Sequence, residues 1–350
     1  MQQTKKVMVG SVPVGGDAPV SVQSMCTTNT ANARQTLEQI DRLADAGCEI
    51  IRVAVPNADA LDGFETICAQ SQLPVVADIH FDHKLAIAAA ERGAAALRVN
   101  PGNIGSMERV DAVIDAANAA GIPIRIGVNA GSLDEKVAKM PGLSLAERLV
   151  KSCVSFVEHF EAKGFTNIVL SAKAHSVPVT IQTYRMLARQ LPRYPLHVGV
   201  TEAGTLRQGT VKNCAAVGVL LEEGIGNTMR LSLTADPVEE VYVAWELLGA
   251  LGLRRRTPEL VSCPTCGRTQ VDLIGMAQEV QRRLMDVRAP ISVAVMGCVV
   301  NGPGEARDAD IGIACGLGKG VIFVQGEPLR TVPENQLVDE LFTEISKRYQ

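Results

Sequence analysis

Short apolar runs alternate with longer amphipathic segments over residues 1–253. The short runs are apolar at consecutive positions and rich in Val and Ile, as is typical of parallel strands covered on both faces. The longer segments, such as ARQTLEQIDRLADAG, repeat apolar residues at helical spacing. The runs predict eight strands, at residues 20–24, 50–54, 74–79, 95–99, 122–128, 166–171, 196–201 and 227–232.

Eight strand–helix units over this length predict one closed (β/α)8 TIM barrel, residues 1–253. The alternative is a doubly wound open sheet, which usually has fewer strands. Such a sheet often carries a G-x-G-x-x-G motif after its first strand, and no such motif follows residues 20–24. Several predicted helices end at a glycine, including Gly47 and Gly164, which suits a left-handed C-cap.

The pattern changes after Leu253, where RRRTP at residues 254–258 predicts a polar linker. Residues 258–350 then predict a small α+β domain, because its strands and helices no longer alternate regularly. We expect strands at 259–262, 291–297, 309–314 and 320–325, and helices at 270–286 and 334–348.

Composition narrows the class of protein. A net charge of -4 and an aromatic content of 3% argue against a nucleic-acid-binding surface. No apolar run approaches the roughly 20 residues that cross a bilayer, and the N-terminal segment has no apolar core like that of a secretory signal. We therefore expect a cytoplasmic protein with no membrane or nucleic-acid partner.

Polar residues stand at or near the ends of seven of the predicted barrel strands. Active sites of TIM barrels lie at the carboxyl ends of the strands, so these residues are candidates for a site. They are Arg52, Asp78, His80, Arg98, Asn100, Arg125, Asn129, Ser171, Lys173, Thr201, Glu202, Arg230 and Ser232.

An arginine inside an apolar strand is costly unless it is paired or faces a polar ligand. A salt bridge, such as Arg52 with Asp78, could account for a single arginine. Four arginines and Lys173 outnumber the two nearby acids, however, and guanidinium groups bind phosphate oxygens bidentately. The excess predicts a site for a phosphate or diphosphate. Glu202 is either a proton donor there or a partner that neutralises one cation.

Nine cysteines in a large chain without a secretory signal argue against a disulfide framework. Cys263 and Cys266 form a C-x2-C motif, which fits zinc as well as iron. Cys298 lies in MGCVVNGPGE at the end of a predicted strand, and Glu305 lies in the loop that follows it. Cys315 is inside the apolar run DIGIAC, where we expect its side chain to pack rather than bind metal.

Three thiolates and a carboxylate are unusual for structural zinc, which prefers Cys and His, and no histidine follows His197. Three thiolates can hold three corners of a four-iron cluster and leave the fourth iron to a harder, exchangeable ligand. The spacing favours an iron–sulfur cluster over zinc and leaves both possible.

Motifs along nearly the whole chain resemble the 4-hydroxy-3-methylbut-2-enyl diphosphate synthases of the methylerythritol phosphate route to isoprenoids. The SCPTCGRT and VAVMGCVVNGPGEARDADIG segments, at 262–269 and 293–312, are specific to this family in combination with the barrel motifs. The barrel motifs are SVQSM (21–25), ADIHF (77–81), LRVNPGNIG (97–105), IRIGVNAGSL (124–133), SAKAH (171–175), GVTEAG (199–204) and IGNTMRLSLT (225–234).

The resemblance implies the chemistry. The substrate would be 2-C-methyl-D-erythritol 2,4-cyclodiphosphate, which two electrons delivered singly through a 4Fe-4S cluster would open and dehydrate. The resemblance implies Cys263, Cys266, Cys298 and Glu305 as cluster ligands and Glu202 as the essential barrel glutamate. It implies a diphosphate site made of Arg52, Arg98, Arg125, Asn129, Lys173, Arg230 and Ser232.

The resemblance also implies a homodimer of the short, bacterial type, with flavodoxin or ferredoxin as the electron donor. Two other hypotheses stay open on the residues alone. One is a barrel enzyme acting on a sugar phosphate with a structural zinc ribbon. The other is an iron–sulfur carrier or sensor, which would not need the cations at the barrel mouth.

Overall fold

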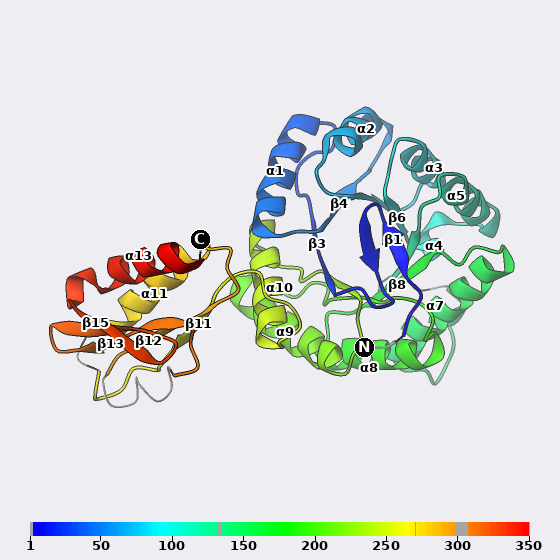
Figure 1. Ribbon diagram of the computed structural model, residues 1–350. Helices are drawn as coiled ribbons and strands as arrows, with labels where there is room; N and C mark the ends of the chain where they lie inside the picture. Colours follow the sequence, from blue (N-terminus) through cyan, green and yellow to red (C-terminus); the bar gives the residue numbers. More distant parts are fainter. Residues whose placement is uncertain (1–2, 132, 134, 270, 299–306, 350) are drawn as a thin grey trace. The chain divides into compact units, whose positions relative to one another are not determined.

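The computed structural model describes residues 3–131, 133, 135–269, 271–298 and 307–349. Contacts divide the chain into two units, Met1–Leu247 and Leu248–Gln350 (Figure 1). In the described part of the chain, no helix has the length and apolarity needed to cross a membrane.

The first unit is a barrel of parallel strands, in the order β8-β7-β6-β5-β4-β3-β10-β9. A bridge between Leu170 and Leu196 joins β8 to the segment that enters β9 and closes the ring. The predicted TIM barrel is therefore confirmed. Its strands are β3 (Ser21–Met25), β4 (Ile50–Ala54), β5 (Val75–Ile79), β6 (Ala96–Val99), β7 (Ile124–Asn129), β8 (Ile168–Lys173), β9 (His197–Val198) and β10 (Thr228–Met229).

A helix follows each barrel strand and lies on the outside of the ring (Figure 1). These helices are α1 (Ala33–Ala46), α2 (Leu61–Gln70), α3 (His83–Glu91), α5 (Met107–Ala119), α7 (Leu145–Ala162), α8 (Val177–Gln190), α9 (Leu206–Glu222) and α10 (Pro237–Ala250). Short turns of helix stand at Ala58–Ala60, at α4 (Pro101–Ile104) and at α6 (Glu135–Ala138).

Capping residues explain where α1 ends and where α7 begins. Gly47 ends α1 with φ 110°, and its N–H bonds to the carbonyls of Leu43 and Ala44. Only glycine adopts this backbone region without strain. At the other end of a helix, Ser144 and Glu147 form a reciprocal capping box that starts α7.

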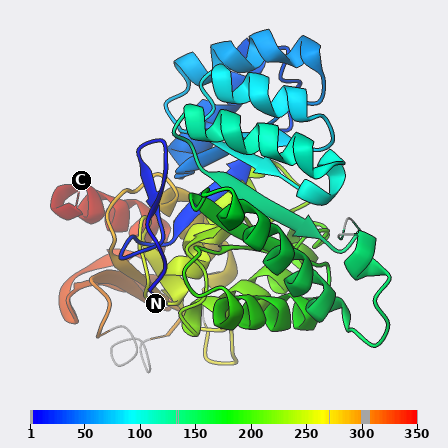
Figure 2. The same cartoon turned by 90° about the vertical axis from the view of Figure 1, so that its right-hand side faces the viewer.

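A hairpin that the sequence analysis missed closes the barrel at the end where its strands begin (Figure 2). It consists of β1 (Val7–Val9) and β2 (Val12–Val14), which pair antiparallel across a tight turn with Gly10 at φ 56°. Its valines pack on the first residues of the strands: Val7, Val9 and Val14 meet Ile50, Val76, Ala96 and Val169. The hairpin therefore covers the barrel end opposite the carboxyl ends of the strands, where the site is predicted.

β9 and β10 are shorter than the predicted runs at 196–201 and 227–232. Beyond these two strands, the side chain of Asn213 bonds to backbone groups that would otherwise pair between strands. The Val200 N–H donates to Asn213 Oδ1 of α9 at 3.2 Å, and Asn213 Nδ2 donates to the Ser232 carbonyl at 3.1 Å. Asn213 of α9 thus links the segments that follow the two strands, in addition to the direct bond from Ser232 Oγ to the Val200 carbonyl.

The second unit is a five-stranded sheet in the order β11-β12-β13-β14-β15. The first three strands are parallel and the last two antiparallel. Its elements are β11 (Glu259–Ser262), α11 (Leu273–Leu284), β12 (Ser292–Met296), β13 (Ile311–Gly316), β14 (Lys319–Val324), β15 (Glu327–Pro333), a helical turn at Glu334–Gln336 and α13 (Leu337–Tyr349). This is the predicted small domain containing a sheet.

β12 alternates between the two faces of this sheet. Val293 and Val295 pack in the core with α11 and α13, whereas Ala294 and Met296 pack with Phe323. The sequence analysis missed β15, whose mostly exposed residues include two prolines and give no apolar run. β15 is an edge strand, and a tight turn with positive φ at Gln325 and Gly326 returns it along β14.

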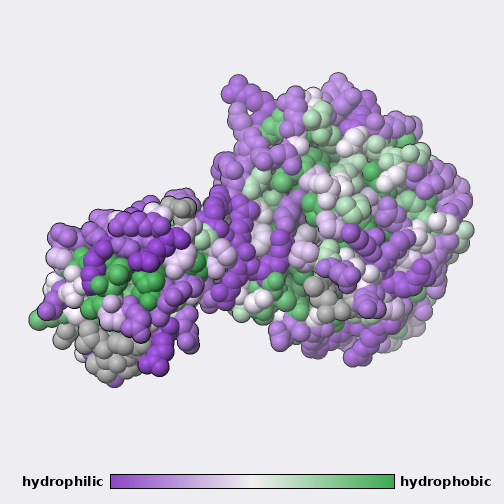
Figure 3. Space-filling model, viewed as in Figure 1, coloured by the Kyte–Doolittle hydropathy of each residue, from purple (hydrophilic) through white to green (hydrophobic). Residues whose placement is uncertain are grey.

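Hydrophilic residues occupy most of the periphery of the barrel in the space-filling view (Figure 3). Apolar residues lie toward the middle of the face shown there. This is the distribution expected of helices that turn one stripe toward the strands and the other toward water.

Candidate active site

Charged side chains line the inside of the barrel, because every second residue of a strand faces the interior. The register places Met25 beside Arg52, Asp78 beside Arg98, and Arg98 beside Arg125. The predicted cations of β4, β6 and β7 are therefore neighbours around the wall.

Asp78 is the carboxylate that the arginines of β4 and β6 approach. It is 2% exposed and accepts hydrogen bonds from Arg98 Nη1 at 3.2 Å and from His80 Nε2 at 3.1 Å. Arg52 Nε lies 3.9 Å from Asp78 Oδ2, the oxygen that His80 also contacts. Burial alone raises the pKa of Asp78, but Arg52, the His80 hydrogen bond and Arg98 together hold it far below the ordinary value. Asp78 is thus an anion that fixes two arginines.

Glu240 is a second buried carboxylate, and it comes from α10 rather than from a strand. Its two oxygens accept from Arg230 Nη2 at 2.9 Å and Nε at 3.0 Å. Ser24 Oγ and the Leu233 N–H donate to the same carboxylate at 2.9 and 3.1 Å. Strand-end reasoning missed Glu240, and the available signal was an acid inside an otherwise apolar helical stretch, PVEEVYVAW.

Arg52 and Arg230 share a weak acceptor, the thioether of Met25. Arg52 donates to Met25 Sδ at 3.0 Å from Nε and 2.7 Å from Nη2, and Arg230 Nη1 lies 3.9 Å from the same sulfur. A thioether accepts hydrogen bonds poorly. An incoming phosphate oxygen would therefore displace little from these guanidinium groups.

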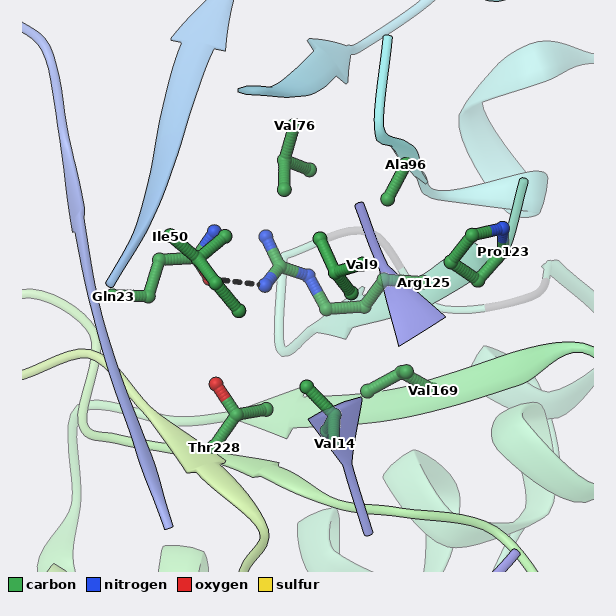
Figure 4. A pocket seen from close by; sticks show the side chains of 10 residues that line it. All are labelled: Val9, Val14, Gln23, Ile50, Val76, Ala96, Pro123, Arg125, Val169 and Thr228. Carbon is green, nitrogen blue, oxygen red and sulfur yellow. Dashed lines mark hydrogen bonds between the residues drawn. The ribbon is translucent and has the colours of Figure 1, made fainter. Parts of the chain in front are cut away.

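Arg125 lies deeper, against the end that the hairpin closes (Figure 4). It donates to Gln23 Oε1, a neutral acceptor, and its Nη2 has no hydrogen-bond partner in the described part of the chain. With Gln23 and Thr228 it lines a small cavity whose other walls are apolar: Val9, Val14, Ile50, Val76, Ala96, Pro123 and Val169.

Lys173 ends β8 opposite Asn129 of β7. Burial first, and then the charges of the neighbouring arginines, hold its pKa well below the ordinary value. His197 on β9 is 1% exposed and stays neutral, because burial and the same cations also lower its pKa. Sequence reasoning missed Gln23 and His197, which stand at inward-facing positions but carry no charge.

The other predicted residues lie around this ring. Ser171 is buried on β8, and Asn100 is buried with its side chain capping α4 through the Gly102 N–H. Ser232 Oγ donates to the Val200 carbonyl at 2.6 Å, and Asn129, with its amide oxygen turned to Arg98, accepts from Nη2 at 3.2 Å. The structure gathers these residues around the barrel interior.

Glu202 differs from the rest. It is exposed, and it is one of two described residues other than glycine with positive φ, here 54°. A side chain in this region costs on the order of 1 kcal/mol, and such residues cluster at functional sites.

Gly127 of β7 makes room for Arg98. A methyl group built on Gly127 would lie 2.6 Å from Arg98 Nε and 3.2 Å from Cζ. We expect Gly127→Ala to push the guanidinium away from Asp78 and to raise the KM for an anionic substrate about tenfold, or roughly 1.4 kcal/mol. Steady-state kinetics would measure this change. Gly131→Ala is the matched control, because no atom of the described residues lies within 4 Å of a methyl group there. Equal KM values for the two variants would contradict the role of Gly127.

Two of the candidate cysteines stand at the carboxyl ends of neighbouring strands in the second unit. β11 runs directly into Cys263, and β12 ends two residues before Cys298. Ser262 pairs with Val295, and the Gly297 N–H donates to Cys263 Sγ at 3.3 Å. Parallel pairing thus brings two parts of the sequence, 35 residues apart, to one edge of the sheet.

Cys266 is exposed, and its pKa is lowered, first by the backbone N–H of Arg268. In contrast, Cys315 is fully buried in the core, and burial raises its pKa to about 12. Cys315 therefore packs in the core, as the apolar run predicted. Glu305 lies outside the described residues, and within them no three His, Cys, Asp or Glu side chains are grouped closely enough to hold a metal.

The donor types still fit an iron–sulfur cluster. Cys263 and Cys298 lie at the ends of two adjoining strands, and the Cys263 sulfur accepts a backbone N–H. Cys266 lies three residues after Cys263, and its pKa is shifted toward the thiolate. Backbone N–H groups near sulfur also stabilise the charge of a cluster.

Two family models together cover most of the chain. Residues 4–245 match the GcpE TIM-barrel domain, and residues 259–347 match the GcpE protein C-terminal domain. The chain belongs to the GcpE family. The family predicted from the motifs is therefore confirmed.

Similar GcpE proteins are named 4-hydroxy-3-methylbut-2-en-1-yl diphosphate synthase (flavodoxin). One from Geobacter sulfurreducens is 53% identical over 99% of this chain and 98% of its own length. Another, from Clostridium acetobutylicum, is 52% identical over 98% of both chains. Among solved structures, a dihydropteroate synthase from Coxiella burnetii has a TM-score of 0.52 with 10% identity, over 71% of this chain and 98% of that one. That likeness concerns the barrel fold alone.

Proposed function

We propose that this chain catalyses the reductive ring opening and dehydration of 2-C-methyl-D-erythritol 2,4-cyclodiphosphate. The product is (E)-4-hydroxy-3-methylbut-2-enyl diphosphate, and the chain is an oxidoreductase of isoprenoid biosynthesis. The observation that carries the proposal is identity above 50% over nearly the whole chain with synthases of this name. A barrel interior with more cations than carboxylates supports it independently.

The reaction is balanced by two electrons and one proton when the phosphates are ionised. The C–O bond to one phosphate of the ring breaks, and a hydroxyl group leaves as water. Because the substrate and product are both anions, the arginines of the barrel bind the diphosphate away from the reacting carbons. Binding energy at such a remote group can be used to position the part of the substrate that reacts.

Within the barrel, Asp78 and Glu240 orient three arginines so that their remaining N–H groups face the substrate. Met25 and Gln23 hold guanidinium groups through weak or neutral acceptors, which phosphate oxygens outcompete. Glu202 is the proton donor in this proposal. Its exposed position and strained backbone are what an acid at the mouth of the site would have.

The second unit holds a 4Fe-4S cluster through Cys263, Cys266, Cys298 and Glu305 in this proposal. The cluster supplies electrons one at a time and a Lewis-acidic iron. The proposed division of roles is therefore substrate binding in residues 1–253 and cluster binding in residues 258–350. We further propose a homodimer that receives electrons from flavodoxin, the donor in the names of the relatives.

We expect anaerobically purified protein to contain about four irons and four acid-labile sulfides per chain. It should then convert the cyclodiphosphate when reduced flavodoxin is supplied. Metal analysis, sulfide determination and phosphorus NMR of the product measure these outcomes. Stoichiometric zinc without sulfide would contradict the proposal and favour a barrel with a structural zinc ribbon.

A further inference from the structure

The barrel interior carries an excess of positive charge in a partly buried space. Arg52 and Arg98 share Asp78, and Arg230 has Glu240 as its partner. Arg125 bonds only to the neutral amide of Gln23 among described residues. Lys173 has neither an ion pair nor a hydrogen bond in the described part of the chain. Two basic side chains, those of Arg125 and Lys173, therefore have no carboxylate of their own.

Lys173 is surrounded by cations on several strands. Its charge interacts with those of Arg230, Arg52, Arg125 and Arg98, which belong to or follow β10, β4, β7 and β6. His197 of β9 and Asn129 of β7 are its neutral neighbours. The nearby carboxylates, Asp78 and Glu240, are already bonded to arginines.

The backbone approaches Lys173 closely at Gly199. A methyl group on Gly199 would lie 2.9 Å from Lys173 Nζ. The same methyl group would lie 2.2 Å from the Arg230 carbonyl oxygen, so the partly buried amine of Lys173 lies beside the backbone of Arg230. The like charges of the arginines raise the free energy of the protonated amine.

Of the five cationic side chains, only Lys173 can release its proton, because a guanidinium group stays protonated in proteins. We propose that Lys173 is an uncharged amine in the ligand-free protein and takes up one proton when a diphosphate binds. Anion binding and proton uptake are then one coupled event. This inference rests on the proposed function for its choice of ligand.

The direction of the pH dependence follows from the charges. Burial and the arginines lower the pKa of Lys173 before binding, and the negative charges of the ligand raise it afterwards. At a pH between these two values, binding takes up a proton, so the Kd rises up to tenfold for each pH unit. Below the lower value the amine is already protonated, and the Kd no longer depends on its titration.

Calorimetric titration of the holoenzyme with the cyclodiphosphate, without reductant, tests the proposal. The acid groups of this ring are strong, so the ligand itself does not titrate near pH 8. Measuring the binding enthalpy in two buffers of different ionisation enthalpy gives the number of protons taken up. We expect a value near one for the wild type and near zero for Lys173→Arg, whose charge is permanent.

An uptake near zero in the wild type, or the same uptake in Lys173→Arg, would overturn the proposal and would assign any proton to another group such as His197. A failure of the cyclodiphosphate to bind would contradict the proposed function instead. In that case, the inorganic cyclic triphosphate ring, whose acid groups are also strong, supplies the proton count. If neither ring binds, the anion site is wrong and this inference falls with it. The slope of log Kd against pH in the wild type gives the proton count independently, and Lys173→Arg assigns it to this lysine.

Discussion

Replacing Cys263 by serine is expected to remove the cluster and with it at least about a thousandfold of the turnover, more than 4 kcal/mol. A serine hydroxyl is a poor ligand for iron compared with a thiolate. The substitution also removes the sulfur that accepts the Gly297 N–H, where the ends of β11 and β12 lie side by side. Iron and sulfide analysis and turnover with reduced flavodoxin would measure the loss.

Cys315→Ala is the matched control in the same unit. Cys315 is 0% exposed and belongs to the core with Val293 and Ile313, so its loss should cost stability but leave iron content unchanged. Full iron content in Cys263→Ser, or loss of iron in Cys315→Ala, would reverse the assignment of these two cysteines.

The fold was predictable where the hydrophobic pattern alone decides it. The eight apolar runs became the eight barrel strands, because strands covered on both faces leave an uninterrupted signal. The hairpin at Val7–Val14 was missed because each of its strands has only three residues, which is too short to give a clear apolar run. β15 was missed because an edge strand needs no apolar face, and its pairing depends on the turn at Gln325 and Gly326.

The site was predictable only for residues whose charge conflicts with a strand interior. Arg52, Arg98 and Arg125 stood out for this reason, and the structure places them around the barrel wall. Gln23 and His197 share the inward-facing register but are neutral, so nothing in the sequence distinguished them from residues of an ordinary core.

Glu240 could not be found from strand ends, because it reaches the site from a helix outside the barrel. A methionine at the end of an apolar strand is typical of a core residue, and the contact of Met25 with Arg52 depends on the register of β3 against β4. Pairings of this kind depend on three-dimensional neighbours and leave no local pattern. For Glu240, the one local signal was an acidic residue inside an otherwise apolar helical stretch.

We expect Glu240→Ala to cause the largest loss of stability of any single change in the barrel interior discussed above. Glu240 is 2% exposed and satisfies four donors, from Arg230, Ser24 and Leu233. Breaking a buried ion pair costs roughly 3–5 kcal/mol. Arg230 is 18% exposed, so part of its charge regains water and the lower end of that range applies. The melting temperature of the barrel should fall by about 6–12 °C, since each kcal/mol lowers it by about 2–4 °C.

Activity should fall together with stability, because Arg230 would no longer be held in place to meet the diphosphate. Glu240→Gln keeps the shape and two of the acceptor contacts but loses the charge, so we expect an intermediate loss of stability and a raised KM. Glu239→Ala, one position earlier on the same helix, is the matched control and should change the melting temperature by less than about 2 °C. Thermal unfolding and KM values measured on the three variants decide the question. A melting temperature for Glu240→Ala equal to that of Glu239→Ala would mean that the Arg230 charge is solvated well enough to need no partner, and that α10 does not position the anion site.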